Sequence, residues 1–296
     1  MLYTIARLQN FGCAFLYSAL TYPLYRSRLQ SLTIEGNTIA IGASVSDKPV
    51  GLALAEILGD GSAKLLSIFV ESNYRRLGIG TALVNTLEEE LILRYCRSIE
   101  IIYIADQSTT LALECLLKKC NWPSAKPRML LCKTTTDDMT NAPWMKLSRL
   151  PASYEIFPWV EITPQERLAL KKQQEEKQWM ASDAIPFDYE QDLEPINSIG
   201  LRYKGEVVGW LITHRTAPDT IRYTCSYVRP DIQKMGRIIP LYIRATQLQM
   251  EAGISKGTWT VSLMHTSMIA FVKKHMEPYL ISLEQSMESS KLLRYS

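Results

Sequence analysis

The chain has 296 residues, 47% of them hydrophobic and 21% charged, which is an ordinary globular composition with room for two domains of about 150 residues each. Its formal net charge of +3 is too small for a dedicated nucleic-acid binder, which would carry a dense basic patch. Charges interrupt the apolar runs well short of the roughly 20 residues of a membrane span, and the N-terminus lacks the pattern of an export signal. We therefore expect a cytoplasmic protein that binds neither nucleic acid nor membrane.

Six cysteines are spread through mostly apolar segments, and none forms a Cys-x-x-Cys pair. They are Cys13, Cys96, Cys115, Cys120, Cys132 and Cys225. This pattern favours free buried thiols over disulfides or a zinc site, so we expect no metal.

The first third of the chain predicts strands framed by helices. Residues 1–32 predict a short strand followed by one or two helices rich in aromatic residues, which either line a pocket or pack on a sheet. Residues 38–45 and 50–57 flank a short turn and predict a hairpin, and residues 63–70 predict a third strand. That strand leads into the most informative turn of the sequence.

The turn reads Arg75-x-x-Gly78-x-Gly80 and precedes a helix predicted over 81–94. Glycines lack a Cβ atom, so backbone N–H groups can approach an anion closely. The start of the helix adds free donors and the positive end of its dipole. The residues therefore predict a pyrophosphate cradle. A Rossmann dinucleotide site fits less well because it requires a third glycine where Thr81-Ala82-Leu83 stands, and a glycine turn of some other α/β domain stays open.

Arg75, Gly78 and Gly80 resemble the acetyl-CoA motif of the GNAT N-acetyltransferase superfamily, and Val70 stands where the final valine of the strand is usual. In that family, two parallel strands splay apart and hold the pantetheine arm, here the strands at 63–70 and 98–105. The resemblance implies acetyl-CoA as cosubstrate. It assigns the contacts to Ile68, Phe69, Val70, Arg75, Arg76, Leu77, Gly78, Ile79, Gly80 and Thr81.

A helix predicted over 110–119 departs from the family at Leu117, where a tyrosine that protonates the CoA thiolate is frequent. Residues 128–133 predict a strand, which we expect to close the first domain as a hairpin with residues 144–150. Pro151 and Pro158 then mark a boundary.

The second half repeats the first, because residues 227–241 align without a gap on residues 69–83. We interpret the chain as two tandem GNAT-like α/β domains, each a mixed, mostly antiparallel sheet flanked by helices. Residues 1–150 form a domain with an intact acetyl-CoA motif and residues 151–296 a degenerate one. Ile238 replaces Gly80, and Pro240 is expected to interrupt the following helix. The second copy should therefore bind acetyl-CoA poorly or not at all and serve as a structural element.

Direct transfer to an amine requires a base. Glu56, near a strand end, is the best-placed carboxylate for this role. The alternative interpretation is that Glu56 is simply a solvent-exposed residue beside a turn. His214, His265 and His275 are further candidates, each more often structural. We hypothesise an acyltransferase that moves the acetyl group of acetyl-CoA to a small-molecule amine, with a protein acceptor still open. The alternative is a non-catalytic protein that senses acetyl-CoA or binds a partner. A monomer and a homodimer both fit.

Overall fold

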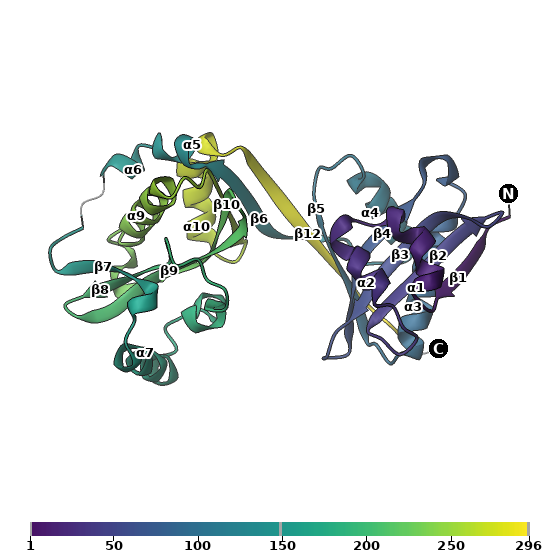
Figure 1. Ribbon diagram of the computed structural model, residues 1–296, viewed down its shortest axis with the longest axis horizontal. Helices are drawn as coiled ribbons and strands as arrows, with labels where there is room; N and C mark the ends of the chain where they lie inside the picture. Colours follow the sequence, from purple (N-terminus) through teal and green to yellow (C-terminus); the bar gives the residue numbers. More distant parts are fainter. Residues whose placement is uncertain (1, 148–149, 295–296) are drawn as a thin grey trace. The chain divides into compact units, whose positions relative to one another are not determined.

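The computed structural model describes residues 2–147 and 150–294 (Figure 1). The chain forms two compact units. Unit 1 contains residues 1–128 together with 286–296, and unit 2 contains residues 129–285. The predicted division into domains of residues 1–150 and 151–296 stays a prediction.

Unit 1 is a mixed sheet with the strand order β1-β2-β3-β4-β5-β12. Its neighbours are antiparallel except for the parallel pair β4–β5. The strands are β1 (Thr4–Leu8), β2 (Thr38–Val45), β3 (Lys48–Ile57), β4 (Ser62–Val70), β5 (Ser98–Ile104) and the last part of β12 (Ser282–Leu292). The predicted hairpin and third strand are confirmed.

Helices cover both faces of this sheet. One face carries α3 (Ile79–Leu93) and α4 (Thr110–Lys119), and Leu83, Leu87 and Leu91 of α3 are fully buried, as their helical spacing predicts. The other face carries a set of short helices. These are α1 (Phe11–Ala14), α2 (Arg26–Gln30) and the 3₁₀ turns η1 (Phe15–Leu20) and η2 (Pro23–Tyr25). We call this second face the acceptor face, because the resemblance implies that the acceptor binds on this side.

Unit 2 repeats this plan with the strand order β6-β11-β10-β9-β8-β7, in which β10–β11 is the parallel pair. Its strands are β6 (Lys126–Thr135), β7 (Tyr154–Pro158), β8 (Ile199–Tyr203), β9 (Glu206–Ala217), β10 (Thr220–Val228) and β11 (Lys256–Ser262). Its helices are α5 (Thr136–Thr140), α6 (Trp144–Leu147), α7 (Pro164–Lys177), α8 (Pro230–Gln233), α9 (Ile238–Glu251) and α10 (Thr266–Phe271). The short turns are η4 (Trp159–Glu161), η5 (Ser182–Ala184), η6 (Pro186–Tyr189), a π-turn η7 (Val272–Met276) and η8 (Glu277–Tyr279). A capping box of Thr163 and Glu166 starts α7.

Each repeat gives its last strand to the other unit. β6 follows α4 along the chain, yet it pairs with β11 from Met129↔Ser262 to Thr135↔Lys256. β12 follows the helices of unit 2, yet it pairs with β5 from Ser286↔Ile104 to Leu292↔Ser98 (Figure 1). The prediction that residues 128–133 close a hairpin with residues 144–150 is therefore wrong. Trp144–Leu147 forms α6, and residues 148–149 lie outside the described part of the chain.

The cysteines are free thiols, four of them buried, while Cys13 and Cys115 are exposed. Within residues 2–147 and 150–294, no group of three or more His, Cys, Asp or Glu side chains is placed to hold a metal ion. None of the helices in these residues has the length and hydropathy of a segment that crosses a bilayer.

Candidate functional site

The parallel strands β4 and β5 open into a wedge. They pair from Ser62↔Ser98 to Leu65↔Ile101 and then separate. Beyond that point, β4 continues along β3 and β5 continues along β12. The edges that face each other across the wedge therefore present backbone N–H and C=O groups, which can bind an amide-rich chain like an added strand. The predicted separation of the two parallel strands is confirmed.

A β-bulge sits where the wedge begins. In the pairing of β3 with β4, Leu54 opposes Ser67 and Ala55 opposes Leu65, so Leu66 is the extra residue. Ser67 is buried, and its hydroxyl hydrogen-bonds Thr21 Oγ1 at 2.7 Å. The hydrogen bond of Ser67, next to the bulge, thus connects the start of the wedge to the short helices on the acceptor face.

The predicted phosphate turn follows the end of β4. Arg75 donates from Nε to the carbonyl oxygen of Val70 at 2.9 Å, and this bond fixes the turn against the strand. Arg76 and Gly78 have φ angles of +64° and +84°, which direct successive backbone N–H groups to one side. Positive φ is costly for a residue with a Cβ atom, and this accounts for glycine at position 78.

The first turn of α3 supplies further donors. Its N-cap residue Gly78 has no side chain to cap the helix, and the first bond of the helix runs from Ala82 N to Gly78 O at 3.0 Å. The N–H groups of Ile79, Gly80 and Thr81 precede that bond and lack intrahelical acceptors. Such a helix start is a site for a phosphate anion.

Gly80 lies where α4 and the end of β4 approach the start of α3. A Cβ atom there would lie 3.4 Å from Leu116 Cδ2 of α4 and 3.9 Å from Val70 Cγ2. A larger side chain would fill the space between the helix start, α4 and the end of β4. The residues present therefore fit a pyrophosphate approaching from the wedge.

The ten residues predicted to contact the cofactor are contiguous in the structure. They cover the end of β4, the turn and the first turn of α3. Ile68 and Val70 pack towards α3, whereas Phe69 is 39% exposed on the other face, and its ring centre lies 6.0 Å from the Arg75 guanidinium carbon. Ile79 is buried in the core of unit 1. Their contact with acetyl-CoA stays a prediction.

Glu56, the predicted base, lies in β3 opposite Lys64 of β4. Its carboxylate pairs with Arg28 at 2.8 Å. Lys64 precedes Leu65, which forms the last β4–β5 pair, so Glu56 is level with the closed part of the strands. Its catalytic role stays a prediction.

Leu117 is only 4% exposed and belongs to the core of unit 1. On the same side of the sheet, Tyr103 of β5 donates a hydrogen bond to Glu114 Oε1 of α4 at 2.9 Å. Burial, reinforced by Glu114, raises the pKa of Tyr103 to about 12, so this hydroxyl keeps its proton at neutral pH.

Unit 2 contains a second copy of the turn. Gln233 donates from Nε2 to the carbonyl oxygen of Val228 at 2.9 Å, and Gly236 has a φ of +66°. β10 and β11 also separate, after Tyr223↔Trp259. Pro240 is the third residue of α9 and does not interrupt the helix. Proline lacks a backbone N–H, but an N–H in the first turn of a helix has no intrahelical acceptor, so no hydrogen bond is lost. Ile238, in the place of Gly80, packs against the apolar cluster beneath α9.

The face of unit 2 that corresponds to the acceptor face is filled by aromatic side chains. Trp179 and Trp210 lie with ring centres 5.7 Å apart, and Tyr227 donates from its hydroxyl to Trp179 O at 3.0 Å. His214 is held between Thr224 Oγ1 at 2.8 Å and Gln191 O at 3.0 Å. These contacts describe a packed core, which supports a structural role for the second copy.

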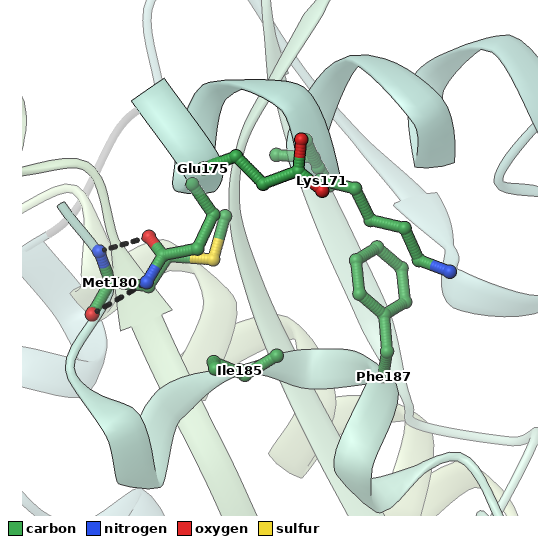
Figure 2. Close-up of a pocket in the computed structure, with 7 residues that line it drawn as sticks. Lys171, Glu175, Met180, Ile185 and Phe187 are labelled. Atoms are coloured by element: carbon green, nitrogen blue, oxygen red, sulfur yellow. Dashed lines mark hydrogen bonds between the residues drawn. The ribbon is translucent and has the colours of Figure 1, made fainter. Parts of the chain in front are cut away.

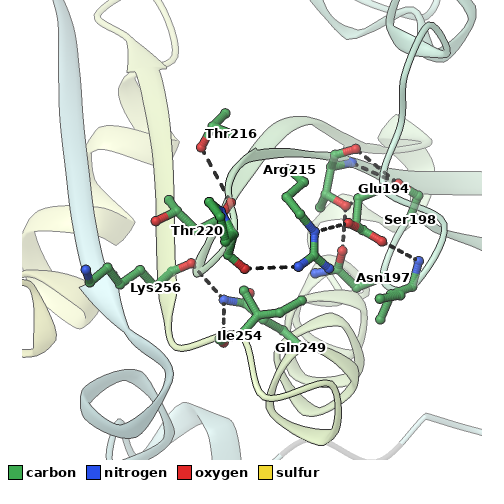
Figure 3. Close-up of polar contacts among 12 residues, drawn as sticks. Glu194, Asn197, Ser198, Arg215, Thr216, Thr220, Gln249, Ile254 and Lys256 are labelled. Atoms are coloured by element: carbon green, nitrogen blue, oxygen red, sulfur yellow. Dashed lines mark hydrogen bonds and ion pairs between the residues drawn. The ribbon is translucent and has the colours of Figure 1, made fainter.

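Several other polar side chains of unit 2 are paired within the unit. Figure 3 shows Arg215, which donates from Nε to Glu194 Oε2 at 2.6 Å. Gln249 donates from Nε2 to the carbonyl oxygens of Ile254 at 3.2 Å and Lys256 at 2.9 Å. This network connects the ends of β9, α9 and β11, and both Arg215 and Gln249 use it to pair with groups of unit 2.

A small pocket of about 180 Å³ lies between α7 and the turns η5 and η6. Figure 2 shows Ile185 and Phe187 on one side and Lys171 and Glu175 of α7 on the other. Met180 closes one end through hydrogen bonds of its backbone with Gln174. The pocket has neither the phosphate turn nor a strand edge, so the wedge of unit 1 is the stronger candidate site.

Comparisons with known proteins agree with this geometry. Residues 3–121 match the family model of the Acetyltransferase (GNAT) family. No curated protein matches the sequence significantly. Among solved structures, a tandem GNAT protein from the clavulanic acid biosynthesis pathway is similar over 100% of both chains, with a TM-score of 0.62 and 14% identity.

Two further solved structures share the fold. A GCN5-related N-acetyltransferase from Sphaerobacter thermophilus has a TM-score of 0.62 and 13% identity, over 99% of this chain and 96% of its own. A glucosamine N-acetyltransferase region of a fungal β-N-acetylglucosaminidase has a TM-score of 0.66 and 14% identity, over 98% of this chain and 38% of that protein. Residues 3–121 are therefore similar to the GNAT acetyltransferase family, and the fold of the chain is similar to that of tandem GNAT structures.

Proposed function

We propose that unit 1 transfers the acetyl group of acetyl-CoA to an amine. The observation that carries this proposal is the open wedge of β4 and β5, which leads directly to the Arg75–Gly80 turn. The N–H groups of the turn and the Arg76 side chain bind the phosphates. The free edges of the strands bind the amides of the pantetheine arm.

In this reaction the amine nitrogen attacks the carbonyl carbon of the thioester. A C–N bond forms and the C–S bond breaks, the amine loses a proton, and the CoA thiolate gains one. Free N–H groups on the wedge edge of β4 stabilise the negative charge that develops on the carbonyl oxygen. CoA is a tolerable leaving group, because an ordinary thiol has a pKa of about 8.5.

A second candidate function is acetyl-CoA binding without turnover. The observation that favours it is the buried Leu117, which replaces the tyrosine frequent in the family. Both functions require the same phosphate turn, so a measurement of CoA binding does not distinguish them. A measurement of acetyl transfer does.

Calorimetric titration with CoA tests the cradle. We expect one CoA per chain, because Ile238 stands in the place of Gly80 in the second copy. Arg76→Glu should weaken binding at least tenfold because it places a carboxylate beside the phosphates. Lys118→Glu, an equal charge change on an exposed residue of α4, is the control and should leave the affinity unchanged. Failure of the wild-type protein to bind CoA would refute both functions.

Turnover is then measured as release of free CoA thiol in the presence of primary amines. The exposed aromatic residues on the acceptor face, among them Phe15 and Tyr22, favour a small acceptor with an apolar body. The assay should therefore begin with aromatic monoamines and include a peptide with a free N-terminus for the protein alternative. CoA binding with no acetylated product from either class would favour the non-catalytic function.

A further inference from the structure

The last strand of the chain brings a carboxylate to the acceptor face of unit 1. In the antiparallel pairing of β12 with β5, Glu288 lies opposite Ile102. Directly opposed residues of neighbouring strands project from the same face of a sheet. Leu65↔Ile101 is the last pair of β4 with β5, so Ile102 is the first residue of β5 that borders the wedge. Glu288 is therefore level with the beginning of the wedge.

The neighbours of Glu288 along β12 establish which face it occupies. Lys291 reaches Glu88 of α3 at 2.6 Å, and Ser289 donates to Pro123 O at 2.7 Å beneath the same helices. Side chains alternate along a strand, so Glu288 projects away from α3 and towards the acceptor face.

Glu288 differs in position from the other carboxylates of this face. Glu56 and Glu100 flank Lys64 in the closed part of the strands, and Glu100 pairs with Lys64 at 3.2 Å. Glu288 pairs with Arg128 at 2.9 Å, and both side chains remain accessible, with 38% and 39% of their areas exposed. The ion pair orients the carboxylate without enclosing it.

We propose that Glu288 binds the ammonium group of the acceptor and accepts a proton from it. The inference rests on the proposed function, and it names a group that completes the same site. The ammonium transfers one proton to a Glu288 carboxylate oxygen, directly or through one water molecule, and the resulting amine attacks the thioester carbon. CoA leaves as a thiolate that is protonated, and Glu288 returns its proton to solvent.

This role gives the exchanged strand a function. β12 ends the second repeat, yet its last residues belong to unit 1. The catalytic centre of the first repeat is then complete only when the end of the second repeat has paired with β5.

A pair of CoA thioethers tests the site without knowledge of the acceptor. One carries a 2-aminoethyl group on the CoA sulfur, and the other carries a propyl group of similar shape without charge. Calorimetry on the full chain should show the aminoethyl compound binding about tenfold more tightly, as expected for one charge-assisted hydrogen bond. Glu288→Gln should abolish this preference and leave the affinity for the propyl compound unchanged, and Glu288→Asp should retain part of it.

Glu284→Gln is the matched control. Glu284 lies on the same strand, but it belongs to unit 2 and pairs with Lys133 at 3.1 Å, so its loss should not change the preference. The double variant Arg128→Glu, Glu288→Arg restores an ion pair with the charges exchanged. If Glu288 itself binds the ammonium group, this variant should still lack the preference for the aminoethyl compound. If the ion pair only stabilises the structure, the preference should return. No preference in the wild-type protein, or a preference retained by Glu288→Gln, would overturn the inference. No binding of either compound or of CoA itself would instead refute the proposed function and the inference with it.

Discussion

Arg75 and Val70 are joined by a hydrogen bond of 2.9 Å from the guanidinium Nε to the carbonyl oxygen. The bond closes the turn between β4 and α3, and it places the backbone donors of residues 76–81 at the mouth of the wedge. Gln233 makes the equivalent bond to Val228 in unit 2, also at 2.9 Å. A single N–H donor suffices for this contact, so arginine and glutamine both satisfy it.

Arg75→Ala should weaken CoA binding about tenfold, because the turn loses its bond to β4 and the phosphates lose a nearby cation. Arg75→Gln should weaken it by only about twofold to fivefold, since an amide can keep the bond to Val70 as Gln233 does. Calorimetric titration of each variant with CoA measures both effects. Gln233→Ala is the matched control in the second copy and should not change the affinity. An equal loss in this variant would contradict assignment of CoA to unit 1.

The turn was predictable from the sequence because its determinants are local. Gly78 and Gly80 follow an apolar strand and precede a helix with regular apolar spacing, and a helix start binds anions wherever the fold places it. The duplication was also readable, because the second copy preserves Gly236 and the flanking strand.

The exchange of strands was not predictable from the sequence. Backbone hydrogen bonds are the same for every residue, and the alternation of Lys126–Thr135 fits β11 as well as it fits a partner in its own repeat. The sequence therefore did not identify Glu288 as a candidate site residue. Its position near the wedge follows only from the pairing of β12 with β5. Trp144–Leu147 has the aromatic and apolar composition of a strand, yet it forms a helix whose Trp144 packs in unit 2.

Lys291→Ala should destabilise unit 1 by about 2–4 kcal/mol, because it leaves the buried carboxylate of Glu88 without its cation. Lys291 contacts Glu88 at 2.6 Å and the carbonyl oxygen of Cys120 at 2.6 Å. Urea denaturation followed by circular dichroism measures the change. Lys256→Ala, which removes an exposed pair with Asp219, is the control and should cost less than about 1 kcal/mol. Equal costs for the two variants would show that the end of β12 does not anchor unit 1.

Thr21→Val should raise the KM for the amine without changing the affinity for CoA. The buried bond of 2.7 Å between Thr21 and Ser67 holds the short helices of the acceptor face against the bulge of β4. Valine has a similar shape but leaves the Ser67 hydroxyl without this partner, at a cost of about 1–2 kcal/mol in stability. Steady-state kinetics with a fixed excess of acetyl-CoA measures KM, and calorimetry measures CoA binding. The double variant Thr21→Val, Ser67→Ala should recover part of the stability, because no buried hydroxyl is then unpaired.

Glu166→Gln should destabilise unit 2 by about 1–3 kcal/mol at pH 7. Arg202 donates to Glu166 at 2.6 Å and, together with Thr163, lowers the pKa of this carboxyl to about 2. Folding therefore favours the ionised form, whose stabilising contribution is present above the ordinary pKa of 4.5 and is lost as the pH falls towards 2. Glutamine retains the capping role at this position, so the variant removes mainly the charge.

Urea denaturation of both proteins across the acid range tests this pH dependence. The wild type should be more stable above pH 5, and the difference should shrink progressively between about pH 5 and pH 2 because protonation of Glu166 removes the charge that the variant lacks. Glu176→Gln is the control on the same helix, since its contact with Lys172 is 3.9 Å long and exposed. A difference that stays constant down to pH 3 would mean that packing of the side chain, rather than its charge, stabilises α7 against β8.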